Sequence, residues 1–366
     1  MLKKILSALL VLSIVFCIGS VALAQPEDAI QITASMSGSV SSKVAKQVIV
    51  STKKEMIFTE KPTDSCHAST VLPLDNGNVV AAWFGGSGEQ ENDVKIYTSV
   101  RTEDGWSKPV AVVGKPNTAH WNPVLFQLDD NTIALYFKVG KDTACWQTYF
   151  ATSEDGIHWS VPQELVPGDT SGGRGPVKNK PIRLDDGTIL APASDESGSV
   201  WRSFVDISTD NGKTWRRTAF VPTKYCIWFE APMIQPTLWQ SEDGSVHMFT
   251  RTKVGQIYRS DSTDGGRTWC RAYSTGLANN NSGIDLDVDD NGRIFLACNP
   301  YATPGIRTPL TLAVSTNNGK DFTRILNFET GVGEYSYPSV VIKDNIIHIT
   351  YTYERDYIAY WQIELA

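Results

Sequence analysis

The sequence has few cysteines, and they do not follow the spacing of a zinc site. There are 6 cysteines in 366 residues, and no two of them form a C-x-x-C pair. Zinc sites and disulfide-rich domains both depend on close and regular cysteine spacing. A chain of this length buries a large core without cross-links, so its folding requires no disulfide. We therefore expect no metal and no other cofactor.

Positive charge is also scarce. The chain has 33 lysines and arginines against 40 aspartates and glutamates, a formal net charge of −7. A nucleic-acid-binding protein needs a basic surface that gathers phosphates, so we expect no nucleic acid as a partner. The hydrophobic share of 41% is that of an ordinary globular protein, which excludes a disordered, collagen-like or multi-spanning membrane protein.

A long hydrophobic run occurs only at the N-terminus. Two lysines precede an apolar stretch over residues 5–18, and the sequence Val-Ala-Leu-Ala then ends at Ala24. A basic start, an apolar stretch and an A-x-A site are typical of a secretory signal peptide. We predict that residues 1–24 form this peptide and that the mature protein is secreted or periplasmic, with no membrane span. A polar lead over residues 25–45 follows.

A short turn signal recurs six times along the chain. Each copy ends in Gly or Asn and precedes an alternating apolar run, such as residues 79–83 or 346–350. The six turns lie at residues 75–77, 129–131, 185–187, 242–244, 290–292 and 343–345. Their last residues are 54, 56, 57, 48 and 53 positions apart. Such turns, followed by β-branched and alternating runs, predict β-hairpins that repeat regularly along the chain.

A second repeat lies between these turns. Residues 208–215 and 262–269 both read S-x-D-x-G-x-T-W, looser copies occur at 152–159 and 315–322, and a worn copy lies near 103–105. In such a turn the Asp side chain accepts backbone N–H bonds, the Gly takes a strained conformation and the Trp packs beneath. We interpret it as a marker of the fold rather than as a substrate contact.

Six hairpin units at this spacing predict an all-β fold, a six-bladed β-propeller. The sixth copy ends at Ala366 without the second repeat. We expect a strand within residues 47–58 to complete that last blade and close the ring. Residues 46–366 then form one domain, and no helix-period segment of comparable strength interrupts it.

The S-x-D-x-G-x-T-W turns, known as Asp-boxes, resemble those of the sialidase (neuraminidase) superfamily and specifically its BNR-repeat branch. The resemblance covers residues 46–366. It implies an exo-glycosidase pocket on the propeller axis. In that family three arginines hold the carboxylate of the substrate. A tyrosine acts as nucleophile with the help of a glutamate, and an aspartate is the acid/base.

Four positions can be carried over from the family pattern. Residues 235–251 match the stretch from the assisting glutamate through a D-G turn to the second arginine, so Arg251 fits that arginine and Gln235 replaces the glutamate. Arg307 fits the third arginine, and Tyr335, in the segment Glu-Tyr-Ser-Tyr, fits the nucleophile. The resemblance thus implies that Arg251 and Arg307 bind a carboxylate through bidentate hydrogen bonds.

The first arginine and the assisting base of the family are both absent. His67 stands where that arginine is expected, and it would donate a third hydrogen bond to the carboxylate. Considered without the family, His67 is a buried histidine hydrogen-bonded near a strand end. Gln235 cannot take the proton of a tyrosine nucleophile, so Glu230, five residues upstream, is the first substitute to test.

The acid/base is expected in the glycine-rich loop over residues 85–93. Glu89 lies among glycines, where its side chain could reach the pocket, and Asp93 lies at the start of the next strand. We rank Glu89 and Asp93 as equal candidates, with a turn cap as the alternative role of Asp93.

Further substrate-binding candidates open the inner strands of three blades. They supply amide and charged groups near an aromatic side chain, as sugar sites require. These residues are His120, Asn122, Lys178, Asn179, Lys180 and Asp285. The alternative is that they belong to solvated polar loops.

These residues favour an exported, exo-acting glycoside hydrolase that cleaves a terminal acidic sugar, sialic or uronic, from a glycan. In a retaining mechanism Tyr335 attacks the anomeric carbon while Glu89 or Asp93 protonates the leaving oxygen. Two alternatives stay open. The first is another glycosidase that uses His67, or a polysaccharide lyase with His67 and Tyr335 as base and acid. The second is a propeller that binds glycans without catalysis.

Overall fold

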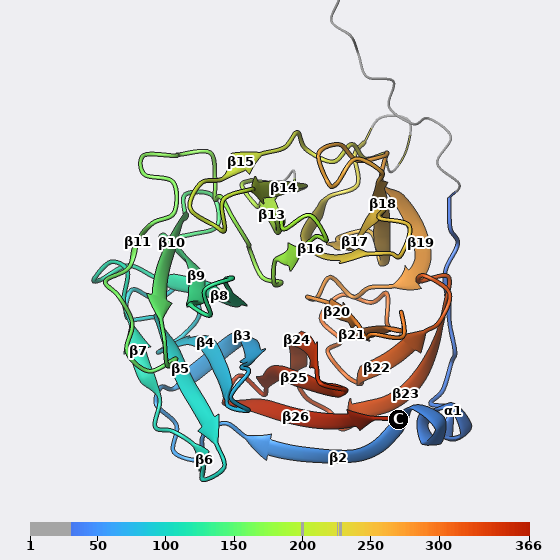
Figure 1. Cartoon of the computed structure of the whole chain (residues 1–366), viewed down its shortest axis with the longest axis horizontal. Coiled ribbons are helices and arrows are strands. Elements are labelled where there is room, and N and C mark those ends of the chain that lie inside the picture. Colours follow the sequence, from blue (N-terminus) through green and yellow to red (C-terminus); the bar gives the residue numbers. More distant parts are fainter. Residues whose placement is uncertain (1–30, 199–200, 225, 227–228) are drawn as a thin grey trace, which may run out of the picture.

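The computed structural model describes residues 31–198, 201–224, 226 and 229–366. The predicted signal peptide, residues 1–24, lies outside this part of the chain. In the described part six β-sheets form a ring (Figure 1), which confirms the predicted six-bladed β-propeller. None of the helices within these ranges is long and apolar enough to cross a membrane.

The first three blades are built from strands that follow one another along the chain. Blade 1 contains β3 (Ser65–Pro73), β4 (Val79–Gly86), β5 (Lys95–Thr102), β6 (Gly105–Trp106) and β7 (Val110–Val112). Blade 2 contains β8 (His120–Gln127), β9 (Ile133–Val139), β10 (Gln147–Ser153) and β11 (Gln163–Glu164). Blade 3 contains β12 (Ile182–Arg183), β13 (Ile189–Asp195), β14 (Arg202–Ser208) and β15 (Arg216–Arg217).

Blade 4 is again built from consecutive strands, whereas blades 5 and 6 each combine C-terminal strands with one N-terminal strand. Blade 4 contains β16 (Met233–Gln240), β17 (Val246–Thr252), β18 (Gln256–Ser262) and β19 (Tyr273–Ala278). Blade 5 contains β20 (Asp285–Val288), β21 (Ile294–Cys298), β22 (Leu310–Ser315), β23 (Asp321–Glu329) and β1 (Ser35–Met36). Blade 6 contains β24 (Tyr335–Lys343), β25 (Ile346–Tyr353), β26 (Tyr357–Leu365) and β2 (Ile49–Met56).

The ring closes where the two ends of the chain pair, as the sequence predicts. Strand β2 runs antiparallel to β26, from Ile49 opposite Leu365 to Met56 opposite Ala359. The residues of the polar lead also pack on the propeller from residue 33 onward, because β1 pairs with β23 and the helix α1 (Ser42–Val48) contacts the same strand.

The Asp-boxes are self-contained turns. In the third blade Ser208 Oγ donates to Asp210 at 2.8 Å and accepts from the N–H of Gly212 at 2.8 Å. Asp210 accepts from the N–H and the hydroxyl of Thr214, and Trp215 Nε1 donates to the oxygen of Gly212. These bonds satisfy the turn without tertiary partners, so the sequence pattern by itself fixes the local structure.

In the looser Asp-box of the second blade, the hydrogen-bonded residues lie one position after those that the sequence pattern predicts. Ser153 and Asp155 form the hydrogen-bonded pair there, at 3.1 Å, in place of Thr152 and Glu154. Gly156 donates to Ser153 Oγ, so the same turn forms with one residue fewer.

Four inner strands, β3, β8, β16 and β24, carry the same irregularity near their start. In each, the pairing register shifts and one non-glycine residue takes a positive φ. These residues are Ala68 (51°), Asn122 (42°), Gln235 (54°) and Tyr337 (56°). A bulge of this kind re-aims a side chain, and positive φ at such residues concentrates at functional sites.

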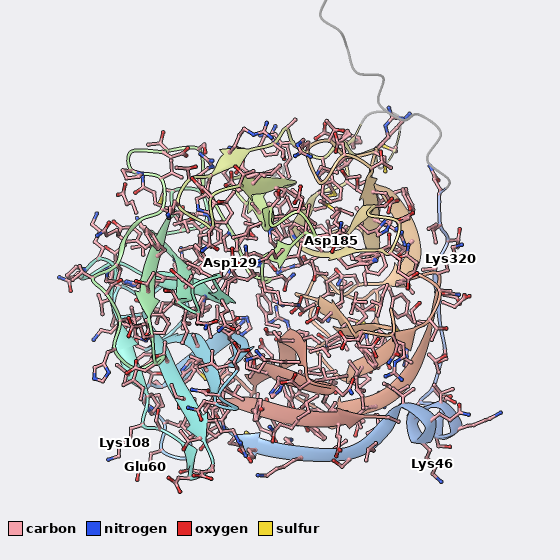
Figure 2. The ribbon with its side chains drawn as sticks, viewed as in Figure 1. Lys46, Glu60, Lys108, Asp129, Asp185 and Lys320 are labelled. Atoms are coloured by element: carbon pink, nitrogen blue, oxygen red, sulfur yellow. The ribbon has the colours of Figure 1, made fainter. Side chains whose placement is uncertain are left out.

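Side chains fill the space between neighbouring sheets (Figure 2). Each interface between blades has its own hydrophobic cluster. Trp215 packs on Tyr136 between the second and third blades, and Ile57, Trp83 and Ile358 join the sixth blade to the first. This radial packing holds the inner strands at fixed positions around the axis.

Candidate active site

A segment that precedes β12 reaches across the propeller axis. Lys178 donates through Nζ to the backbone oxygen of Ile284, at 3.1 Å, and to that of Pro338. Lys180 donates to two further backbone oxygens, of β20 and β24, at 2.7 and 2.6 Å. The segment thereby ties the third blade to the inner strands of the fifth and sixth blades.

Asn179 and Asp285 also connect blades. Asn179 Nδ2 donates to two backbone oxygens of β16, at 3.1 and 3.0 Å. Asp285 is fully buried and accepts from Thr237 Oγ1 at 2.7 Å and from a backbone N–H of β24 at 2.8 Å. Burial lowers the pKa of Lys178 to about 7, an effect that the charge of Asp285 opposes. These polar candidates are therefore gathered at the axis, where their side chains hold the blades together.

Arg251 projects from β17 and is only 7% exposed. Its Nη1 donates to Gln235 Oε1 at 3.1 Å and to Tyr337 Oη at 2.5 Å. Its Nε donates to Asn281 Oδ1 at 2.9 Å. All three partners are uncharged side chains, and Arg251 forms no ion pair with a residue that the structure describes. A buried guanidinium without a direct ion-pair partner is suited to binding an anion.

The ring of Tyr337 lies among cations. Arg307, Arg251 and Lys178 are 5.5, 5.6 and 5.9 Å from its centroid. Cations near the face of an aromatic ring are attracted by its electron density. Tyr337 therefore contacts both of the arginines that the sequence assigns to a substrate carboxylate.

His67 packs on the same ring, with the two ring centroids 4.2 Å apart. Its Nδ1 lies 2.8 Å from Thr352 Oγ1. Burial and the surrounding cations hold the pKa of His67 well below its usual range. The imidazole is therefore neutral near pH 7, so it does not replace the positive charge of the family's first arginine.

Arg307 belongs to a chain of ion pairs. Its Nη1 donates to Glu334 Oε1 at 2.5 Å, and the same oxygen accepts from Arg355 Nε at 3.0 Å. Arg355 Nη1 donates in turn to Glu89 Oε2 at 2.6 Å. The chain connects Glu89, on the loop after β4, with the surroundings of Tyr337. Sequence reasoning misses Glu334 and Arg355 as site residues, because Glu334 lies just before β24 and Arg355 lies in the turn after β25, and neither follows a recognisable pattern.

Asp93 and His120 have structural partners. Asp93 accepts from the N–H and the hydroxyl of Ser87, at 3.0 and 2.9 Å, and so fastens its own loop. His120 Nδ1 lies 2.8 Å from the oxygen of Val94, and its Nε2 accepts from the N–H of Gly114 at 2.8 Å. Both nitrogens of His120 are thus occupied within the protein.

The remaining two candidates differ in burial. Asn122 occupies the bulge of β8 and is 6% exposed. Glu230 is exposed, lies three residues before β16 begins, and makes no hydrogen bond or ion pair with the described part of the chain. The structure does not bring Glu230 into contact with Gln235.

Tyr335 and Tyr337 point to different parts of the molecule, although they are two residues apart on one strand. Tyr335 packs against Tyr353 between the fifth and sixth blades, with ring centroids 5.1 Å apart. Burial and a hydrogen bond to Glu354 raise the pKa of Tyr335 above its usual range. Tyr337 instead joins the cluster of the first two blades. One signal in the sequence marks Tyr337, since it precedes a proline as Gln235 does.

Glu196 is a further residue that sequence reasoning misses. It follows β13 and is 6% exposed. Its Oε1 accepts from Gln235 Nε2 at 3.3 Å and from Ser194 Oγ at 3.1 Å. Burial raises the pKa of Glu196, against the opposing charge of Arg251. The only sequence signal is an acidic pair, Asp195 and Glu196, at the end of an apolar strand.

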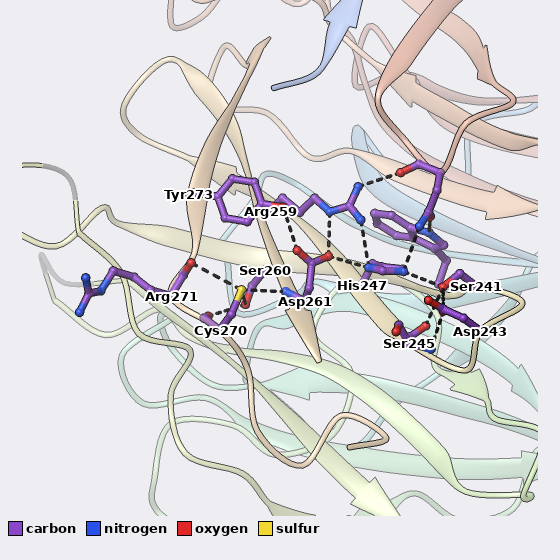
Figure 3. A network of polar contacts seen from close by, with 12 residues as sticks. Ser241, Asp243, Ser245, His247, Arg259, Ser260, Asp261, Cys270, Arg271 and Tyr273 are labelled. Carbon is purple, nitrogen blue, oxygen red and sulfur yellow. Dashed lines mark hydrogen bonds and ion pairs between the residues drawn. The ribbon is translucent and has the colours of Figure 1, made fainter. Parts of the chain in front are cut away.

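A separate polar network lies in the fourth blade (Figure 3). His247 Nδ1 lies 2.6 Å from Asp261 Oδ1, and its Nε2 lies 2.8 Å from Ser241 Oγ, the order of a Ser-His-Asp triad. However, Ser241 Oγ also donates to Asp243 at 2.6 Å, and the N–H groups of Ser241 and Gly244 both donate within the turn. Because these amides are not free to form an oxyanion hole, we interpret the network as structural.

A comparison with known proteins shows which family this chain matches and which solved structures share its fold. Residues 77–349 match the BNR repeat-like domain. A protein of unknown function from Dyadobacter fermentans is similar in structure, with a TM-score of 0.70 and 17% identity over 87% of this chain and 100% of that chain. The NanB sialidase of Streptococcus pneumoniae has a TM-score of 0.68 and 13% identity over 90% of this chain and 73% of that chain.

A Hadza microbial sialidase is also similar, with a TM-score of 0.67 and 19% identity. The match covers 82% of this chain and 65% of the sialidase, so this chain spans slightly less than two thirds of that protein. At these identities the solved structures show a common fold, the sialidase-type propeller.

Proposed function

Because this chain belongs to the BNR repeat-like domain family and shares its fold with known sialidases, we propose that it is an exo-acting glycoside hydrolase that removes a terminal acidic sugar from a glycan. The observation that carries the proposal is Arg251, a buried cation that forms no direct ion pair with a described residue, in hydrogen-bond contact with Tyr337. A sugar carboxylate supplies the missing charge and brings the sugar ring to the tyrosine. Export through the N-terminal signal sequence belongs to the same proposal.

We assign the role of nucleophile to Tyr337, with Tyr335 as the alternative that the family pattern names. Tyr337 Oη receives a hydrogen bond from a guanidinium, which stabilises negative charge on that oxygen. Neutral His67 packs against the same ring, and we propose that it receives the phenol proton as the new bond forms. Its lowered pKa makes it a weak base, so the guanidinium charge beside Tyr337 Oη carries most of the activation. Glu230 is not the first choice for this base, because it makes no hydrogen bond or ion pair with the described part of the chain and does not contact Gln235.

The proposed reaction has two steps. In the first, Tyr337 Oη bonds to the anomeric carbon, the glycosidic C–O bond breaks, the phenol proton passes to His67, and Glu89 protonates the leaving oxygen. In the second, water attacks the anomeric carbon, the bond between that carbon and Tyr337 Oη breaks, Glu89 takes a proton of the water, and Tyr337 recovers its proton from His67. We favour Glu89 over Asp93 for its position, because the ion-pair chain places it next to Arg355 on the way to Arg307, whereas Asp93 holds Ser87. Arg355 favours the ionised form of Glu89, so the proposal requires this ion pair to open when the substrate binds.

The test is release of a fluorogenic aglycone from an α-sialoside and from a β-glucuronide by the purified mature chain. We expect turnover of one of them, and its loss in Arg251→Ala, because that variant lacks the cation for the carboxylate. Loss of turnover with Glu89→Gln, alongside retention with Asp93→Asn, identifies the acid/base. Absence of turnover on a complete panel of acidic glycosides contradicts the proposal.

A polysaccharide lyase is the second candidate, and the contact between neutral His67 and Tyr337 favours it. In a lyase Arg251 would neutralise the carboxylate of a uronate, one of the two residues would take the proton α to that carboxylate, and the other would protonate the leaving oxygen. Digestion of uronate polymers separates the two candidates, because a lyase leaves an unsaturated sugar that absorbs in the near ultraviolet.

A further inference from the structure

Gln235 stands where the family pattern places a glutamate, and a carboxylate lies beside it. Glu196 comes from the neighbouring blade, and its Oε1 accepts from Gln235 Nε2 at 3.3 Å. Strands β13 and β16 lie next to each other across the interface between the third and fourth blades. The carboxyl group of this region therefore belongs to Glu196, next to residue 235, and not to residue 235 itself.

Ser194 fixes the relative position of the two side chains. Its Oγ donates to Glu196 Oε1 at 3.1 Å and accepts from the backbone N–H of Gln235 at 3.2 Å. The other oxygen of Glu196, Oε2, has no hydrogen-bond partner among the residues that the structure describes. Two cations act on this carboxylate, Arg251 of β17 and Lys138 of β9, and Asp195 precedes it in the chain.

The hydrogen bonds around Gln235 are directional. An amide side chain donates only through nitrogen and accepts only through oxygen. Because Arg251 donates to Gln235 Oε1 at 3.1 Å, the nitrogen must face the other way, toward Glu196. The result is a relay from Glu196 through Gln235 to Arg251 and the hydroxyl of Tyr337.

We propose that Glu196 is a positioning residue that supplies the carboxyl group missing at position 235 and fixes the Gln235 side chain against Arg251. Glu196 acts through Gln235 and not on the sugar itself. The catalytic part of this inference rests on the proposed function, whereas the coupling between the two positions does not.

A swap of the two side chains gives the sharpest test. In Gln235→Glu alone, two carboxyl groups face each other at the distance of the present hydrogen bond. They repel each other when both are ionised. In the double variant with Glu196→Gln the pair is restored with its direction reversed, because the new amide at 196 donates to the new carboxylate at 235. We expect thermal unfolding of Gln235→Glu to occur at a lower temperature at pH 8 than at pH 5, and this pH dependence to disappear in the double variant.

The comparison of the wild-type chain with the two single variants and the double variant is a stability cycle, and it needs no substrate. Non-additive effects of the two substitutions support a shared charge. Additive effects, equal at pH 5 and pH 8, overturn the proposal. Asp195→Asn is the matched control, since its carboxylate bonds to Ser197 and not to Gln235, and it is expected to leave the cycle unchanged.

Turnover then tests the effect on the site. We expect Glu196→Gln to lower kcat by about 10- to 100-fold, as small misplacements of reacting groups do, with KM nearly unchanged and with recovery in the swapped double variant. An unaltered kcat and pH profile in Glu196→Gln overturns the positioning role. If the wild-type chain turns over no acidic glycoside, the proposed function fails, while the stability cycle still decides whether Glu196 and position 235 are coupled.

Discussion

Replacement of either tyrosine of β24 by phenylalanine tests which of them performs the chemistry. Tyr337→Phe removes a hydroxyl that Arg251 contacts, and Tyr335→Phe removes one that bonds to Glu354. The two substitutions are chemically identical, and both side chains are buried, at 8% and 6% exposed. Each variant is therefore the control for the other.

The structure sets the expected size of both effects. Each variant loses one hydrogen bond, which costs about 1 kcal/mol of stability. Arg251 keeps its bonds to Gln235 and Asn281 in Tyr337→Phe, so the cation stays in place. Loss of the nucleophile, in contrast, costs at least about 10³-fold in kcat/KM, or about 4 kcal/mol at 1.36 kcal/mol for each tenfold change.

The assay measures kcat/KM on the acidic glycoside that the wild-type chain turns over, together with the unfolding temperature of each variant. We expect Tyr337→Phe to fall below about a thousandth of the wild-type value, Tyr335→Phe to stay within about tenfold, and the two unfolding temperatures to be similar. The reverse order of activities would refute our interpretation of the bulge and would return the nucleophile to Tyr335.

Three more predictions concern binding, packing and pH. Arg251→Lys keeps the charge but loses the planar fork, so we expect KM to rise by about tenfold or more in steady-state kinetics; an unchanged KM would argue against a carboxylate at this position. Gly140→Ala places a Cβ 2.4 Å from the Cα of Trp146, and we expect a loss of about 1–3 kcal/mol in denaturant unfolding, whereas Gly77→Ala, whose Cβ meets nothing within 4 Å, tests the cost of positive φ alone. Arg101 lowers the pKa of Glu55 from 4.5 to about 2 between the last blade and the first, so this ion pair stabilises the fold fully above pH 4.5 and is lost as the pH falls toward 2. Because solvent screens this part-exposed pair, Glu55→Gln is expected to flatten acid unfolding in that window by about 1 kcal/mol, and an identical acid midpoint would contradict this.

The fold could be predicted because its signals are local. The Asp-box that contains Ser208, Asp210 and Gly212 satisfies its own hydrogen bonds within one turn. Such a turn forms wherever its residues occur, and its spacing along the chain counts the blades. The one-residue shift at Ser153 and Asp155 arose where the pattern was degraded and the hydrogen bonds selected the nearest suitable side chains.

The candidate site was predictable only where a family pattern applied. Arg251 and Arg307 both lie beside one tyrosine ring, as expected of residues that serve one pocket. That ring belongs to Tyr337, whereas the pattern named Tyr335. Tyr337 lies in a bulge with a φ of 56° and contacts Arg251 and His67, whereas Tyr335 packs against Tyr353. Backbone conformation at a single residue leaves almost no trace in composition or periodicity, so sequence reasoning could not separate the two.

The sequence by itself determined the number of blades, the closing strand and the family, because hairpin turns, β-branched runs and Asp-boxes depend on residues close together in the chain. Only the tertiary structure decided which polar groups meet at the axis. Glu196 reaches Gln235 across 39 positions of sequence, and Glu89 reaches Arg355 across 266. Such contacts depend on how six blades pack around one axis, and burial there sets the charge of His67.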